Sequence, residues 1–212
     1  IGISQTDFYP AGASIGEKGR IVQSISYCKQ IQMSLRLYAE DHDGRYPDSV
    51  DLQILDSNQA FRQLFKTGIL ETEVIFGSSN SPYHPDGNIG AAPDFPDALK
   101  PGENHWAMTK GINDSMEGNI PLVFENPAEA TYPPKWNADA TWPSKWQTYF
   151  KTPKPGRTWS GGKIVIGFND SSVEVLQLDS DKGSNIGLKP KNDGTPIFPV
   201  LDPKLEILNV AK

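Results

Sequence analysis

One stretch of this chain constrains the fold more than any other, an apolar stripe within residues 19–42. Apolar side chains recur there every three or four residues, at Ile21, Ile25, Cys28, Ile31, Leu35 and Tyr38. This spacing places them on one face of an α-helix, with polar residues such as Lys29 and Glu40 on the other. The Asp43-Gly44 pair and Pro47 that follow are typical helix stops. The stripe therefore predicts a long amphipathic helix over 19–42.

Downstream of this helix, the patterns predict one further helix and a set of short strands. The second helix is expected over 57–67, capped by Asp56 or Ser57 and ended by Gly68. Strands are expected at 71–76, 105–110, 120–125, 164–168 and 173–178. The last two flank Asn169-Asp170-Ser171-Ser172, which is a good hairpin turn. The apolar run 205–210 is either an edge strand or a segment lying across the helix. The fold class is α+β, a long helix followed by an antiparallel sheet.

Composition limits both the architecture and the partners. The chain has 212 residues and a net charge of −6, so it is long enough for one ordinary domain and lacks the basic balance of a nucleic-acid binder. Its 19 glycines and 18 prolines predict long loops, above all over 77–102. The single cysteine excludes an intrachain disulfide, and no apolar run approaches the ~20 residues that cross a bilayer. We expect a flexible segment over 1–18 and one globular domain over 19–212.

No set of residues predicts an active site. Gly12-Ala13-Ser14-Ile15-Gly16 matches the G-x-S-x-G pattern of a hydrolase nucleophile elbow, but no buried strand precedes it. We interpret it as a linker of small residues. The three histidines, at positions 42, 84 and 105, are too scattered to form a triad or a ligand set. The expectation is a protein that is not an enzyme and that has no catalytic residues.

Two groups of residues are candidates for binding. Asp179 and Asp181 form a D-x-D pattern that could coordinate calcium, although a solvated acidic turn has the same composition; no other cofactor is expected. The second group comprises the aromatic residues Tyr132, Trp136, Trp142 and Trp146. Exposed tryptophans stack on sugars or on partner side chains, whereas buried ones would cover the sheet. We weigh the covering role more heavily and keep the group as a candidate partner-binding surface.

Two motifs resemble a known family. The segment from Cys28 to Pro47 runs from a cysteine through Lys29-Gln30-Ile31 to Tyr38-Ala39-Glu40 and Gly44-Arg45-Tyr46-Pro47. The segment 159–173 resembles a closing motif of the form His-x-Gly-Gly followed by a strand and an Asp-Gly turn. The segments 105–106 and 121–127 fit the central strands of the same family. Together they resemble bacterial type II secretion-like pseudopilins with prepilin-type cleavage and methylation signals. Here Trp159 stands in place of the family's histidine, Asp170-Ser171 in place of Asp-Gly, and the family's N-terminal apolar helix is not present.

The resemblance implies a pilin-like fold, with one long N-terminal helix packed on an antiparallel sheet. It implies a non-catalytic head domain of a type II secretion or type IV pilus-like assembly, located in the periplasm or at the cell surface. The expected partners are other pilin-like subunits or secretion components, with membrane contact only through an inner-membrane anchor absent from this chain. The alternative is an extracytoplasmic binding module that uses the aromatic group for a glycan or a protein partner.

Overall fold

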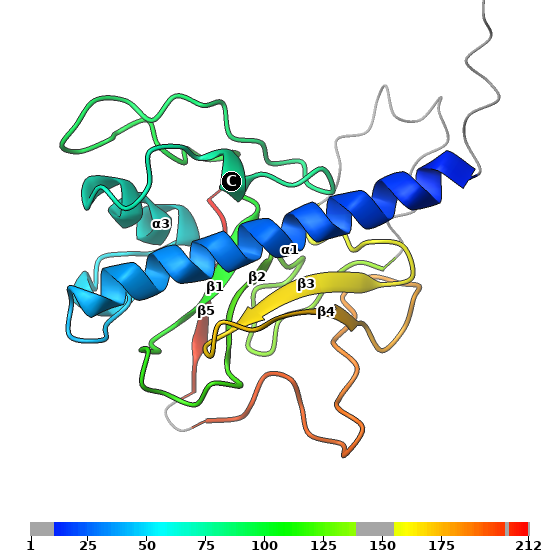
Figure 1. Ribbon diagram of the computed structural model, residues 1–212. Coiled ribbons are helices and arrows are strands. Elements are labelled where there is room, and N and C mark those ends of the chain that lie inside the picture. The colour runs from blue at the N-terminus through cyan, green and yellow to red at the C-terminus, as the bar shows by residue number, and fades with distance from the viewer. Residues whose placement is uncertain (1–10, 139–154, 202–203, 212) are drawn as a thin grey trace, which may run out of the picture.

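The computed structural model describes residues 11–138, 155–201 and 204–211, and it is an α+β fold in which one long helix packs on an antiparallel sheet (Figure 1). The helix, α1, spans Ala11–Glu40. It begins earlier than the apolar stripe, because residues 11–18, which were expected to belong to the N-terminal segment, are already helical. Backbone hydrogen bonds propagate a helix without an apolar face, and the stripe therefore marks only the part of α1 that packs.

The sheet has five strands in the order β4-β3-β2-β1-β5, and every neighbouring pair is antiparallel. Their bounds are β1 Trp106–Lys110, β2 Pro121–Glu125, β3 Lys163–Phe168, β4 Val173–Gln177 and β5 Glu206–Leu208. Of the five strands expected before the C-terminal run, the four at 105–110, 120–125, 164–168 and 173–178 are confirmed within a residue or two. Of the two alternatives for that run, the structure shows an edge strand, β5, paired with β1.

Helix α1 lies diagonally across the sheet, against β2, β3 and β4, and its N-terminal end projects past the body of the sheet (Figure 1). Cys28, Ile31 and Leu35 are fully buried beneath it. Each large apolar side chain buried this way contributes about 1.5–3 kcal/mol. The stripe predicted from the sequence is therefore the packed face of α1.

Side chains of α1 also bind the turn between β3 and β4. Gln32 donates its amide N–H to the Phe168 carbonyl at 2.6 Å, and Arg36 Nε donates to the Ser171 hydroxyl at 2.8 Å. Lys29 donates to the Ser171 carbonyl, and a second guanidinium nitrogen of Arg36 donates to the Asn169 carbonyl. The turn between β3 and β4 is thus fastened to the middle of the helix.

Two short helices cover the β1 side of the molecule. α2 spans Pro47–Val50, and α3 spans Ser57–Lys66 and lies against β1. The Asp56 side chain caps α3 by accepting the Gln59 amide N–H at 2.8 Å, and Gly68 follows with φ of 73°. The sequence-based prediction of this helix and both of its ends is confirmed.

The expected strand over 71–76 is wrong. Val74–Phe76 forms a short 3₁₀ helix, η1, closed by the Phe76 amide N–H donating to the Glu73 carbonyl. An apolar run of three residues carries too little periodicity to distinguish a strand from a tight turn. Here the Phe76 ring packs against Phe61 at 5.1 Å between ring centres, so α3 holds the segment in place. No helix or regular strand occurs in the loop 77–102.

Candidate functional site

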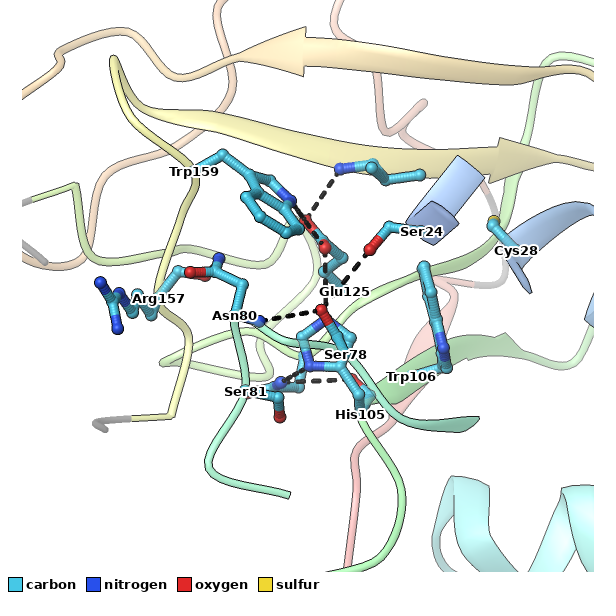
Figure 2. Close-up of polar contacts among 12 residues, drawn as sticks. Ser24, Cys28, Ser78, Asn80, Ser81, His105, Trp106, Glu125, Arg157 and Trp159 are labelled. Atoms are coloured by element: carbon cyan, nitrogen blue, oxygen red, sulfur yellow. Dashed lines mark hydrogen bonds and ion pairs between the residues drawn. The ribbon is translucent and has the colours of Figure 1, made fainter. Parts of the chain in front are cut away.

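The most concentrated chemistry in the described residues is a buried carboxylate at the end of β2. Glu125 is completely buried. Its Oε1 accepts the Trp159 indole N–H at 2.9 Å and faces His105 Nε2 at 3.3 Å. Its Oε2 accepts the Val165 amide N–H at 2.9 Å. We call Glu125, His105, Asn126 and Trp159 the Glu125 cluster; Figure 2 labels Glu125, His105 and Trp159.

The hydrogen bonds of Asn126 determine where the proton of His105 lies. Asn126 Oδ1 accepts the Gly156 amide N–H at 2.8 Å, so its NH₂ group faces His105 Nδ1 at 2.8 Å. An NH₂ group only donates, and His105 Nδ1 must therefore be an acceptor without a proton. The hydrogen-bond pattern thus assigns the donor role to Nε2, which faces Glu125.

The surroundings of the Glu125 cluster are closed to solvent. Trp136, fully buried, donates its indole N–H to the Glu125 backbone carbonyl at 3.0 Å. The Cys28 thiol points at the Val123 carbonyl from 3.7 Å. Burial, with a smaller contribution from the Glu125 charge, raises the pKa of Cys28 well above its ordinary value, so this thiol stays protonated. Nearby, the Ser24 and Ser78 hydroxyls lie 3.5 Å apart and join α1 to the loop after η1 (Figure 2).

This arrangement connects strands of the sheet and is closed to solvent. A catalytic carboxylate–histidine pair must be reachable by a substrate, and the His105 side chain is only 1% exposed. Each Glu125 oxygen is already occupied by N–H donors, which is the condition for tolerating a buried charge. The cluster links β1, β2 and β3 through one carboxylate.

A second group of carboxylates lies at the loop 77–102. Ligand oxygens of Glu73, Asp86 and Glu103 lie within 4.8 Å of one another. The two oxygens of buried Glu73 accept the amide N–H groups of Gly87 at 2.7 Å and Leu99 at 3.1 Å, and so pin two points of the loop. Burial raises the pKa of Glu103, and the charges of Glu73 and Asp86 raise it further. Oxygen ligands of this kind suit calcium, but the same geometry serves to organise the loop.

The structure separates the residues that the sequence singled out. Trp136 lies in the core and Tyr132 is 8% exposed, so both side chains mainly cover the sheet. Trp142 and Trp146 lie outside the described residues. Asp179 and Asp181 are exposed, and the one grouping of potential metal ligands in the described residues does not include them.

The histidines and the G-x-S-x-G motif also stay apart. His42 stacks on Tyr38 with 3.9 Å between ring centres, His84 is exposed, and His105 is buried with Glu125. Residues 12–16 belong to α1, which excludes the strand-to-helix turn that a nucleophile elbow requires.

Sequence reasoning missed Glu125 itself. The only signal was an acidic residue ending an otherwise apolar strand, Pro121-Leu122-Val123-Phe124, next to Asn126. A solvated strand end has the same pattern. The partners that bury the carboxylate come from positions 20 residues upstream and 34 and 40 residues downstream, and no local pattern connects them.

A shallow hollow of about 390 Å³ lies beside the edge strand β5. Tyr132 lines it, and its buried phenolic oxygen has no hydrogen-bond partner among the described residues. Burial raises the pKa of Tyr132 to about 12, so the phenol keeps its proton at neutral pH. This hollow combines open space with an unsatisfied polar group.

Comparison with protein-family models, curated proteins and solved structures finds no match to this chain. Among the helices of the described residues, none is both long enough and apolar enough to cross a membrane.

Proposed function

We propose that this chain is the head domain of a pseudopilin-like subunit of a type II secretion or type IV pilus-like assembly. In this role it acts through contacts with neighbouring subunits and catalyses no reaction. The observation that carries the proposal is the helix α1, thirty residues long, packed along one face and uncovered along the other. The motifs 28–47 and 159–173 support it through their resemblance to that family.

The uncovered face of α1 carries large apolar side chains. Val22 is 63% exposed, Met33 55% and Leu37 50%. At 100° per residue these three positions fall within a 60° sector, on the side of the helix away from Ile31. Apolar groups aligned on one exposed face are typical of a surface that a partner covers. A second α1, or a helix of another subunit, would bury them.

The attachment of α1 to the sheet suits a subunit that must keep its shape in an assembly. The hydrogen bonds of Lys29, Gln32 and Arg36 fasten the middle of the helix to the β3–β4 turn. Toward the projecting end, Glu17 accepts the amide and hydroxyl of Ser160 at 2.7 and 2.8 Å. Load applied to α1 therefore passes directly to the sheet.

On this proposal the head faces the periplasm or the cell exterior. Its partners are other pilin-like subunits or secretion components, and an inner-membrane anchor outside these 212 residues holds it in place. The head binds no cofactor to carry out this role.

Cysteine cross-linking of the full-length protein in its own bacterium tests the proposal. Val22→Cys and Met33→Cys are each oxidised in intact cells, and Lys191→Cys, on an exposed loop, serves as the matched control. Native Cys28 is buried and contributes no background. We expect disulfide-linked oligomers from the two α1 variants and only monomers from Lys191→Cys. Cross-linking of the α1 variants no greater than that of the control would reject the proposal.

A further inference from the structure

The sulfur-bearing side chains of this protein, three methionines and one cysteine, lie in very different environments. Met33, on α1, is 55% exposed, whereas Met108, in β1, is completely buried, and Met116 is partly buried against the core. Cys28 is fully buried, and burial raises the pKa of its thiol, so the reactive thiolate is not formed at neutral pH. Because oxidants react fastest with sulfur that solvent can reach, Met33 is the side chain of this protein most open to oxidation.

Met33 stands in the middle of the exposed face of α1. In the helical projection it lies between Val22 and Leu37, and Leu37 is its neighbour one turn further along the helix. Its thioether belongs to the apolar surface that a neighbouring subunit covers in the proposed function. A change of polarity at position 33 therefore acts on that contact directly.

The hydrogen-bond donors one turn away from Met33 are already engaged. Lys29 and Arg36 donate to oxygens of the β3–β4 turn. Gln30 donates to the Ser26 carbonyl at 3.3 Å, within α1 itself. A sulfoxide oxygen at position 33 would thus accept its hydrogen bonds from water while the face is exposed. A partner that packs on the face removes this water, and a polar acceptor buried without a donor opposes binding.

We propose that Met33 is a reversible oxidation site, at which a peroxide switches off the contact made by the exposed face of α1. Hydrogen peroxide transfers one oxygen atom to the thioether: the O–O bond breaks, an S–O bond forms and water leaves. The sulfur gives up two electrons, which reduce the peroxide. A methionine sulfoxide reductase reverses the step with two thiols, which form a disulfide while their two protons leave with the oxygen as water. This regulation rests on the proposed function, since it acts on the same face.

The first measurement locates the oxidation. The purified 212-residue protein is treated with hydrogen peroxide, and the uptake of oxygen at each methionine is followed by mass spectrometry of its peptides. We expect Met33 to react at least about tenfold faster than Met108, with Met116 between them. Methionine sulfoxide reductase with dithiothreitol should return the Met33 peptide to its original mass. Equal rates for Met33 and Met108 would overturn the proposal.

The second measurement connects oxidation to the contact. A photo-cross-linking residue at position 22 of the full-length protein records the contacts of α1 in intact cells without adding a cysteine. Peroxide given while the protein is being made should lower the cross-linked fraction about tenfold. Met33→Leu is the matched control, because leucine keeps the apolar surface and has no sulfur, and it should cross-link equally with and without peroxide. Met33→Gln carries a permanent polar group and should cross-link weakly even without peroxide.

The variants separate the possible failures. An equal fall in cross-linking by peroxide in Met33→Leu would mean that peroxide acts elsewhere, and it would overturn the proposal, as would a Met33→Gln protein that cross-links as well as Met33→Leu. Absence of cross-links before any oxidation would instead reject the proposed function, and this regulation with it. The thermal midpoints of both variants should stay close to that of the unaltered protein because the side chain is exposed, which separates a lost contact from lost folding.

Discussion

Gln32 of α1 lies so close to Gly167 of β3 that a β-carbon on the glycine would stand 2.5 Å from its side-chain amide. The same carbon would stand 2.7 Å from the Cys28 sulfur. The absence of a side chain at Gly167 is therefore what lets the helix descend onto the sheet and lets Gln32 reach the Phe168 carbonyl. Glycine is required at position 167 because α1 lies so close to β3. It is not required by the backbone conformation, which is that of an ordinary strand.

Gly167→Ala should accordingly destabilise the protein by about 1–3 kcal/mol, because α1 must move away from β3. Gly187→Ala is the control, since a β-carbon there meets no atom within 4 Å. Urea unfolding followed by tryptophan fluorescence measures both. Equal midpoints for the two variants would show that α1 accommodates the methyl group without strain.

Glu125→Gln should lower the free energy of unfolding by about 2–4 kcal/mol. The amide NH₂ of glutamine would face an N–H donor from Trp159, His105 or Val165, where the carboxylate accepts from all three. Glu129→Gln removes a carboxylate that pairs with Lys135 at the surface, and should cost less than about 1 kcal/mol. Chemical denaturation at neutral pH distinguishes the two. A loss at Glu125 as small as that at Glu129 would mean that the cluster is not held by its charge.

Glu103→Gln should stabilise the protein at pH 7, and the gain should shrink as the pH falls. Burial and the neighbouring charges of Glu73 and Asp86 raise the pKa of Glu103 in the folded state above its ordinary value of 4.5. The folded state then binds the proton more tightly than the unfolded state, so ionisation of Glu103 opposes folding at every pH above its folded pKa. Glutamine removes that penalty and keeps an oxygen that can accept the Lys100 amide N–H.

The difference in stability is measured as the difference between the thermal midpoints of Glu103→Gln and the unaltered protein, from pH 7 down to pH 4. Glu117→Gln, at an exposed position, provides the baseline. A Glu103→Gln difference that is independent of pH would contradict the assignment of the penalty to ionisation.

Asn169→Asp should destabilise the fold by about 3 kcal/mol or more. The Asn169 amide is completely buried; its NH₂ donates to the carbonyls of Asn113 and Met116 at 3.0 and 3.1 Å, and its oxygen accepts the Tyr46 hydroxyl at 2.8 Å. A carboxylate would set negative oxygen against two carbonyl oxygens. Asn185→Asp, at an exposed position, should change stability little. Similar denaturation midpoints for both variants would rule out the role of Asn169 as a connector.

The elements that could be predicted are those whose pattern is local. Ile31 and Leu35 share a helical period, and Asp56 with Gly68 marks both ends of α3, so neither helix depended on distant residues for recognition. The 3₁₀ turn at Val74–Phe76 was mistaken for a strand because its conformation is decided by Glu73 and by the Phe61 ring.

The candidate sites were harder to predict because they depend on tertiary contacts. The sequence favours a covering role for Trp136 without excluding an exposed platform, and its complete burial and its hydrogen bond to the Glu125 carbonyl, both tertiary features, place it in the core. The β5 hollow joins Tyr132 to Lys204, two positions that no sequence period relates. Glu73, Asp86 and Glu103 likewise meet only because the loop between them folds back.

The hydrogen bonds from α1 to the β3–β4 turn join segments that are synthesised far apart in time. Gln32 and Phe168 are separated by 136 positions, and β3 forms the surface on which the stripe of α1 packs. A chain that emerges from its N-terminus exposes Ile31 and Leu35 long before their cover exists, and contacts of such long sequence separation form slowly. Until β3 has been synthesised, the apolar stripe of α1 therefore lacks much of the surface on which it packs in the folded molecule.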